Sequence, residues 1–348
     1  MLESSVSKRE KTRWTKARRC LLISMLLLMM GTLLNLRSWP LHSWIKSLTV
    51  RLYDNKTTQV ESLQTSSTLE YFVEYPHKYD FILDEPKRCQ QERPFLVLMV
   101  PVTPHNREAR DIIRRTWGTQ TTVLGQTVRH FFLLGLSNEG DGTKHPEPEV
   151  LQESQRHHDI LQSNFLDSYK NLTIKTMVML EWLSAQCSIA TFAMKVDSDI
   201  FLNVHNLVDM LLKAPHYLYM TGLIVRDAEV LRDHDSKWFM PVTVFPESTY
   251  PPYAMGLGYV FSLDLPARIL EASTHVKAVY IEDVYVGLCL RHLGIVLTDP
   301  PRDGLFVTGV PFIISNCYWT SVITTILENS EQLLKVWETY QTQVQAKC

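Results

Sequence analysis

The sequence predicts an α/β fold built on a doubly wound, mostly parallel sheet, preceded by one transmembrane helix and a stem. Three observations support this prediction. An uncharged apolar run lies near the N-terminus, a Ser/Thr/Gln-rich stretch follows it, and short apolar runs then alternate with amphipathic segments. Hydrophobic residues make up 45% of the 348 residues, which is enough to form a large core in the C-terminal part.

The N-terminal residues have the pattern of a membrane anchor. Seven Lys or Arg residues against two Glu residues give residues 1–19 a net charge of +5, and residues 20–36 form a 17-residue apolar run without charge. Because basic flanks stay in the cytosol, we expect a cytosolic tail, a short membrane span and a lumenal remainder. A short span suits early secretory membranes. A cleaved signal peptide is the alternative, although no small-x-small cleavage site follows the run.

The remaining chain suits an oxidising lumen. We expect a stem over 37–75 and a globular domain over 76–348, onto which the aromatic residues near Tyr71 fold back. Asn55 and Asn171 lie in Asn-x-Thr sequons and are predicted glycosylation sites. Five of the six cysteines are lumenal, so we expect one or two disulfides and at least one unpaired thiol. Outside the tail, 28 basic and 35 acidic residues give a charge of −7, which excludes a nucleic-acid-binding surface.

Strands and helices alternate in the first half of the globular part. We expect strands at 95–102, 131–136, 190–196 and 217–225, and helices at 108–117, 147–161, 172–187 and 204–212. A further strand is expected at 259–262. The order of these elements predicts βαβ units and therefore a parallel sheet.

Asp197 and Asp199 directly follow the predicted strand 190–196. Open α/β sheets bind ligands beyond the carboxyl ends of their strands. Two carboxylates separated by one residue suit Mg²⁺ or Mn²⁺, whose remaining ligands come from substrate phosphates. A polar turn without a ligand is the alternative interpretation of the same residues.

Two further motifs lie in the second half. Tyr253, Gly256 and Gly258 belong to an aromatic, glycine-rich segment, where glycine lets the backbone approach a ligand closely or simply forms a turn. Glu282 and Asp283 precede an apolar helical stretch. The pair is either a general base in a cleft or a charge pair that stabilises a helix N-terminus.

Together these motifs resemble the β-1,3-galactosyltransferase family of Golgi type II glycosyltransferases, from about Tyr75 to the C-terminus. Six motifs carry the resemblance, in this order: Arg110-x-x-Ile113-Arg114-x-Thr116-Trp117; Phe132-Leu133-Leu134-Gly135; Asp167-x-Tyr169-x-Asn171-Leu172-Thr173-x-Lys175-Thr176; Asp197-Ser198-Asp199; Tyr250-Pro251-Pro252-Tyr253 with Gly256-x-Gly258-Tyr259; and Glu282-Asp283-Val284-Tyr285-Val286-Gly287.

The resemblance implies a GT-A-like fold, a catalytic domain in the Golgi lumen and Mn²⁺ as cofactor. It implies transfer of galactose from UDP-galactose, with inversion, to the 3-hydroxyl of a glycan acceptor such as terminal GlcNAc on a glycoprotein or glycolipid. We favour galactose over GlcNAc as the transferred sugar because residues 253–256 and 286–290 resemble the galactosyl branch more closely.

The resemblance also implies residue roles. Asp199 is the main metal ligand, with Asp197 on the nucleotide side, and Asp283 is the general base. Glu282 orients the acceptor, and Tyr253, Gly256 and Gly258 are expected to bind substrate. Arg110 and Arg114 are candidates for the nucleotide side, and structural ion pairs are their alternative role.

Two positions depart from the family pattern. Asn164 stands where relatives often have an acid, and Ile326 stands where relatives tend to have a histidine that joins the metal shell. Either Asp199, UDP and water hold the metal alone, or activity is reduced. A β-1,3-N-acetylglucosaminyltransferase, an inactive lectin-like Golgi protein and an adhesion or receptor ectodomain remain as alternatives.

Overall fold

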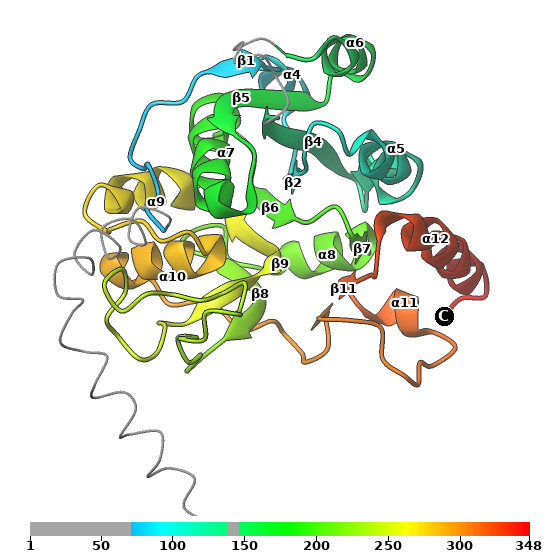
Figure 1. The fold of residues 1–348 in the computed structure, drawn as a ribbon. Helices are drawn as coiled ribbons and strands as arrows, with labels where there is room; N and C mark the ends of the chain where they lie inside the picture. The colour runs from blue at the N-terminus through cyan, green and yellow to red at the C-terminus, as the bar shows by residue number, and fades with distance from the viewer. Residues whose placement is uncertain (1–70, 138–145) are drawn as a thin grey trace, which may run out of the picture. The chain divides into compact units, whose positions relative to one another are not determined.

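A mixed sheet forms the centre of the computed structural model, which describes residues 71–137 and 146–348 (Figure 1). The predicted cytosolic tail, the membrane anchor, the stem as far as residue 70 and Asn55 lie outside the described residues. Within these two ranges, no helix has the length and apolar character that crossing a bilayer requires.

The main sheet combines a parallel centre with antiparallel edges. Its strands lie in the order β1 (Phe81–Leu83), β5 (Ile160–Leu166), β4 (Gln126–Leu136), β2 (Leu96–Pro101), β6 (Phe192–Val196), β9 (Tyr253–Ser262) and β8 (Met220–Val225), with β3 (Thr122–Val123) paired to β4. Strands β5, β4, β2 and β6 are parallel, whereas β1, β9 and β8 run antiparallel to their neighbours. The expected α/β class and parallel centre are therefore confirmed.

A second, smaller sheet contains the strand that follows the Asp197–Asp199 motif. It consists of β7 (Ile200–Leu202), β11 (Thr324–Ile326) and β10 (Phe306–Val307), with β11 in the middle. Ile326 pairs with Ile200 across the antiparallel ladder, and the Leu327 amide donates to the Asp199 carbonyl at 3.0 Å. A segment near the C-terminus is thus hydrogen-bonded to the residues that follow β6.

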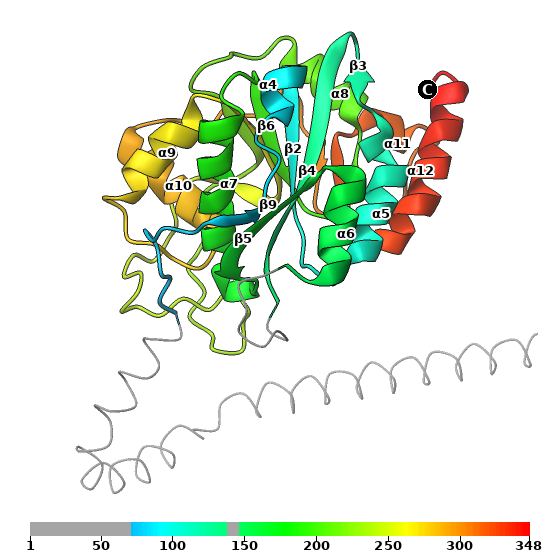
Figure 2. The same cartoon turned by 90° about the horizontal axis from the view of Figure 1, so that it is seen from above.

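Helices cover both faces of the main sheet (Figure 2). One face packs against α7 (Leu172–Gln186), α9 (Leu265–Ser273) and α10 (Glu282–Leu293). The other packs against α5 (Arg107–Arg115), α6 (Pro148–His157), α8 (Val204–Leu211) and α12 (Ser330–Gln345). The shorter helices are α4 (Arg88–Glu92), η2 (Trp117–Thr119), η3 (Tyr169–Asn171) and α11 (Tyr318–Ser321).

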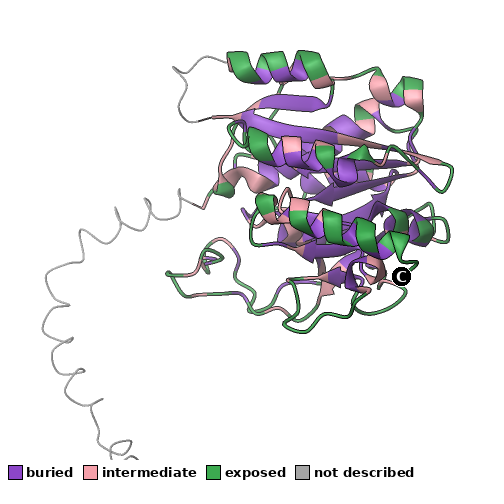
Figure 3. Ribbon diagram, turned by 90° about the vertical axis from the view of Figure 1, so that its right-hand side faces the viewer, coloured by how far each residue is buried: buried purple, intermediate pink, exposed green. Residues whose placement is uncertain are grey.

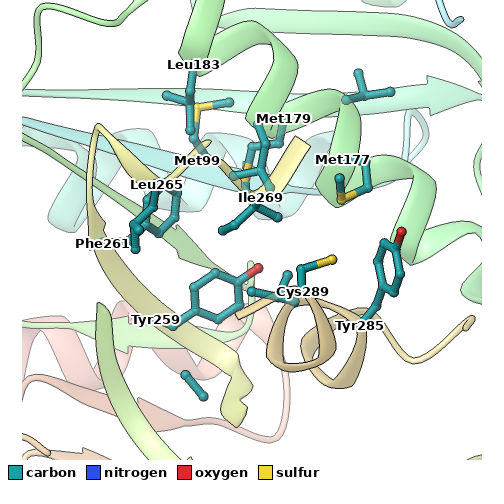
Figure 4. Packing of buried hydrophobic residues seen from close by; sticks show 14 of the residues in the cluster. Met99, Met177, Met179, Leu183, Tyr259, Phe261, Leu265, Ile269, Tyr285 and Cys289 are labelled. Atoms are coloured by element: carbon teal, nitrogen blue, oxygen red, sulfur yellow. The ribbon is translucent and has the colours of Figure 1, made fainter. Parts of the chain in front are cut away.

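Alternation along the central strands produces two cores, because successive side chains of a strand point to opposite faces. In β2, Val97 and Met99 belong to the core beneath α7, α9 and α10, whereas Leu96, Leu98 and Val100 belong to the opposite core. Figure 4 shows side chains of α7 facing those of α9, α10 and β9 in the first core. The central strands β2 and β6 are buried, and the outer faces of the helices are exposed (Figure 3).

The helix expected over 147–161 is shorter than predicted. Helix α6 ends at His157, because His158 adopts a left-handed conformation (φ 53°) and its amide donates to the Ser154 carbonyl. Residues 160–166 then form β5, which lies between β1 and β4 and was missed in the sequence. Ile160 and Leu161, which extended the helical pattern, instead begin a buried strand.

The N-terminal described segment and the cysteines follow the expectations. Tyr71, Tyr75, Tyr79 and Phe81 pack against the core beneath α7, α9 and α10, which confirms that this segment folds onto the domain. Disulfides join Cys89 to Cys187 and Cys317 to Cys348, and Cys289 is buried with a free thiol. Two disulfides and one unpaired thiol therefore match the prediction.

Candidate active site

A cavity of about 290 Å³ lies at the carboxyl ends of β2 and β6, beside the first residues of α7 and α10. Parallel strands place their carboxyl ends at one edge of a sheet, which is where α/β proteins bind ligands. The lining combines both predicted carboxylate pairs with lysines and aromatic residues: Pro101, Tyr169, Leu172, Lys175, Thr176, Lys195, Asp197, Asp199, Ile200, Lys237, Trp238, Met255, Gly256, Leu257, Tyr280, Ile281, Glu282, Asp283 and Ile326.

Asp197 and Asp199 lie where β6 gives way to β7. The Asp197 carboxylate is 40% exposed and forms an ion pair with Lys195 at 2.7 Å. Burial, followed by the negative charge of Asp197, raises the pKa of Asp199. A cation bound by these carboxylates would stabilise their charged forms and so offset both effects.

The metal-ligand set that the protein offers is small. Across the described ranges, no group of three or more His, Cys, Asp or Glu side chains is arranged to hold a metal ion. Ile326, the position at which the resemblance led us to expect a histidine, lines the cavity. Asp197 and Asp199 therefore fit a divalent cation that takes most of its ligands from substrate phosphates and water, as Mg²⁺ and Mn²⁺ do.

Glu282 begins α10 and is buried, with 7% of its side chain exposed. Its Oε2 accepts hydrogen bonds from the hydroxyls of Thr176 (3.2 Å) and Tyr259 (3.1 Å), and its Oε1 lies 3.1 Å from Lys195 Nζ. Burial raises the pKa of Glu282 to about 7, although the positive charge of Lys195 opposes this rise. The carboxylate is thus held in one orientation by three side chains.

Asp283 occupies the next position of the same helical turn. Its Oδ2 accepts the Gly256 amide at 2.8 Å, and its Oδ1 accepts the Val284 amide at 2.9 Å. Burial raises the pKa of Asp283, and these two hydrogen bonds oppose the rise. An ionised carboxylate with a raised pKa is a stronger proton acceptor, which suits a general base.

The side chains of Glu282 and Asp283 both lie close to Gly256. A Cβ at this position would lie 2.9 Å from Glu282 Oε1 and 3.3 Å from Asp283 Oδ2. At Gly258 the nearest atom to such a Cβ is the terminal methyl of Met194, at 2.9 Å. Gly256 lines the cavity, whereas Gly258 and Tyr253 do not, and Tyr253 instead packs against Gly287 of α10.

Arg110 and Arg114 are held in ion pairs away from the cavity lining. The buried Arg110 guanidinium donates to both oxygens of Glu153 at 2.8 and 2.7 Å and to the backbone carbonyls of residues 103 and 104. Arg114 donates to both oxygens of Asp159 at 2.8 and 2.7 Å. The structure therefore brings neither arginine to the two carboxylate pairs. Both arginines instead form structural ion pairs, which was the alternative role expected from the sequence.

The cavity also contains two lysines to which the sequence reasoning gave no site role. Lys195 and Lys175 are both buried, and Lys175 donates to Asp167 at 2.7 Å and to the Val102 carbonyl at 2.8 Å. The signal for both lysines was a charged residue within an otherwise apolar strand or core helix. Tyr169 and Trp238 are half-exposed aromatic residues on the cavity wall.

Comparison with known proteins agrees with this arrangement. The model of the galactosyltransferase family matches residues 108–301, more than half of the chain, and the match includes both carboxylate pairs. The chain belongs to the galactosyltransferase family. The beginning of the match falls in α5 and its end lies beyond α10, so it spans most of the main sheet.

This galactosyltransferase family member is also similar to curated proteins. It is 38% identical over 279 residues to beta-1,3-galactosyltransferase 2 of Homo sapiens, covering 79% of this chain and 65% of that protein. It is 38% identical over 280 residues to beta-1,3-galactosyltransferase 1 of Mus musculus, covering 78% and 82%. The match thus spans slightly less than two thirds of the first relative.

Among solved structures, the apo structure of the WbbM bifunctional glycosyltransferase aligns with a TM-score of 0.38 and 9% identity. The alignment covers 68% of this galactosyltransferase family chain and 46% of the other. A likeness of this size carries no argument about the site.

Proposed function

We propose that this protein transfers galactose from UDP-galactose to the 3-hydroxyl of an acceptor sugar, with inversion, to form a β-1,3 linkage. The acceptor is a terminal GlcNAc or a related sugar on a glycoprotein or glycolipid glycan. The placement of Asp283 in the same cavity as Asp197 and Asp199 carries the proposal, because inversion needs a base on one side of the anomeric carbon and a leaving group on the other. The names of the relatives support the sugar and the linkage.

Each carboxylate has a distinct part in this reaction. Asp283 accepts the proton of the attacking hydroxyl, and its hydrogen bonds with two backbone amides hold it in place. Glu282, held by Thr176 and Tyr259, orients the acceptor. Asp199 and Asp197 would hold Mn²⁺, which supplies stabilisation of the negative charge that develops on the departing UDP.

We also propose that the chain is a single-pass type II protein of the Golgi membrane, with tail 1–19, anchor 20–36, stem 37–75 and catalytic domain 76–348. The basic tail and the apolar run support this topology. Asn171 directly precedes α7, and glycosylation there predicts a mobility shift that Asn171→Gln removes. Digestion of the C-terminal part by protease added to intact microsomes would refute the topology.

A donor screen tests the reaction. The full-length purified protein is offered each UDP-sugar in turn, with Mn²⁺ and a GlcNAc-terminated acceptor, and the linkage of the product is determined by NMR. We expect galactose transfer to the 3-hydroxyl, abolished by chelation and by Asp199→Ala. Transfer of GlcNAc would identify the β-1,3-N-acetylglucosaminyltransferase alternative. Glycan binding without any transfer would favour the lectin-like alternative.

A further inference from the structure

Lys195 is a buried cation whose ammonium group lies close to three oxygen atoms. Its Nζ lies 2.7 Å from Asp197 Oδ1 and 3.1 Å from Glu282 Oε1, and it donates a hydrogen bond to the Gly256 carbonyl. Only 6% of the side chain is exposed. An ammonium group has three N–H donors and no acceptor, so these three oxygens match its full bonding capacity.

The three oxygens come from three separate parts of the site. Asp197 belongs to the segment between β6 and β7, Gly256 lies in β9, and Glu282 begins α10. Strands β6 and β9 are joined by an antiparallel ladder in which Lys195 faces Tyr259. The first turn of α10 is attached to this ladder through the side chains of Lys195, Tyr259 and Asp283.

We propose that Lys195 is a positioning residue that holds the donor-side carboxylate Asp197 and the acceptor-side carboxylate Glu282 at a fixed separation, so that the two substrates meet in the reactive geometry. The proposal rests on the function proposed above. In the absence of a metal, the ammonium group is also the cation that balances Asp197. Lys195 therefore competes with Mn²⁺ for this carboxylate while it keeps the acceptor side in place.

This double role predicts opposite signs for two measurements. Lys195→Met removes the charge and preserves most of the side-chain volume. Removal of a positive charge next to a metal-binding carboxylate strengthens cation binding, so Mn²⁺ affinity, measured by electron paramagnetic resonance without substrates, should rise at least about threefold. Turnover at saturating Mn²⁺ should nevertheless fall at least about tenfold, because the two carboxylates are no longer held together. A lysine needed only for folding would not tighten metal binding.

Lys175→Met is the matched control, because Lys175 is also buried and lines the cavity but bonds to Asp167 and a backbone carbonyl. We expect it to lower thermal stability and to leave Mn²⁺ affinity within about twofold. If Lys195→Met does not fold, Lys195→Arg serves instead. It keeps the charge, so Mn²⁺ affinity should stay near wild type, while the planar guanidinium cannot meet all three oxygens and turnover should fall.

A double-mutant cycle tests the acceptor side. If Lys195 acts on the acceptor through Glu282, Lys195→Met should raise the acceptor KM. This increase should largely disappear in a Glu282→Gln background, whereas the effect of Lys195→Met on Mn²⁺ affinity should persist. Additive effects on acceptor KM, or an Mn²⁺ affinity that is unchanged or weaker in Lys195→Met, would overturn the proposal. Failure of the wild type to transfer galactose would instead refute the proposed function, since the Mn²⁺ titration needs no transfer.

Discussion

Gly256→Ala is the substitution whose effect the structure defines most closely. The added Cβ would lie 2.9 Å from Glu282 Oε1 and 3.3 Å from Asp283 Oδ2, whereas ordinary contacts begin at 3.4 Å. Relief of the shorter contact requires a shift of about half an ångström between β9 and the first turn of α10, or a rotation of the Glu282 carboxylate. Because this turn carries the proposed base, the shift should alter the geometry of proton transfer.

The expected size follows from the steepness of catalysis with geometry. A misplacement of about 1 Å can cost about 10²-fold in rate, so a shift of half that size should cost roughly tenfold in kcat. The fold should remain intact, because Gly256 does not have a positive φ that an alanine would strain. We would measure kcat, both KM values and the thermal midpoint, and we expect the main change in kcat.

Gly258→Ala provides the matched control on the same strand. Its Cβ would meet the terminal methyl of Met194 at 2.9 Å, and a methionine side chain can move away at little cost. We therefore expect near-normal kcat for Gly258→Ala. Equal kcat in Gly256→Ala and wild type would refute the claim that close contact at Gly256 positions the two carboxylates. Equal losses in both variants would refute it as well.

Four further predictions test the site. Asp283→Asn should leave UDP-sugar binding largely intact and lower turnover by about 10²–10⁴-fold, with a smaller loss for Glu282→Gln, and the reverse order would reassign the base. Because burial raises the pKa of Asp283, the acid limb of kcat/KM should lie above pH ~4, the value for an exposed aspartate. Arg110→Met should destabilise the fold by about 1.5–3 kcal/mol, because the buried Glu153 loses its pair with Arg110 and keeps the pair with Arg114 at 2.7 Å. Arg110→Met/Glu153→Leu should recover stability with an unchanged donor KM, and a raised KM would restore the nucleotide-binding role. Ile326→His should tighten Mn²⁺ binding in a direct titration, and an unchanged affinity would show that the side chain does not reach the metal.

Much of the parallel centre could be predicted from sequence because its signals are local. Strand β6 is apolar apart from Lys195, helix α7 is apolar over residues 177–180 and 182–183, and the Asp197–Asp199 motif directly follows β6. The error at residues 147–161 has a physical cause that is equally local. Two apolar residues such as Ile160 and Leu161 are too few to show a periodicity that separates a buried strand from the end of a helix.

The contacts within the site depend on packing between distant segments and could not be predicted in the same way. The proximity of Gly256 to Glu282 and Asp283 requires the antiparallel pairing of β9 with β6, which no local pattern specifies. The ion pairs of Arg110 with Glu153 and of Lys195 with Glu282 join residues far apart in the chain. The residue types at these positions are able to bind substrate or metal, or to form ion pairs. Only the fold distinguishes a structural ion pair from a group that lines the cavity.

The small sheet has a consequence for protein engineering. Because the Leu327 amide bonds to the Asp199 carbonyl and Ile326 pairs with Ile200, the Asp197–Asp199 motif and the strand near the C-terminus form one hydrogen-bonded unit. A chimaera that takes residues 197–202 from one relative and 324–327 from another would pair β7 and β11 strands that did not evolve together. Exchange of both segments together should preserve the placement of Asp197 and Asp199. Exchange of either segment alone should disturb that placement even when every proposed ligand is retained.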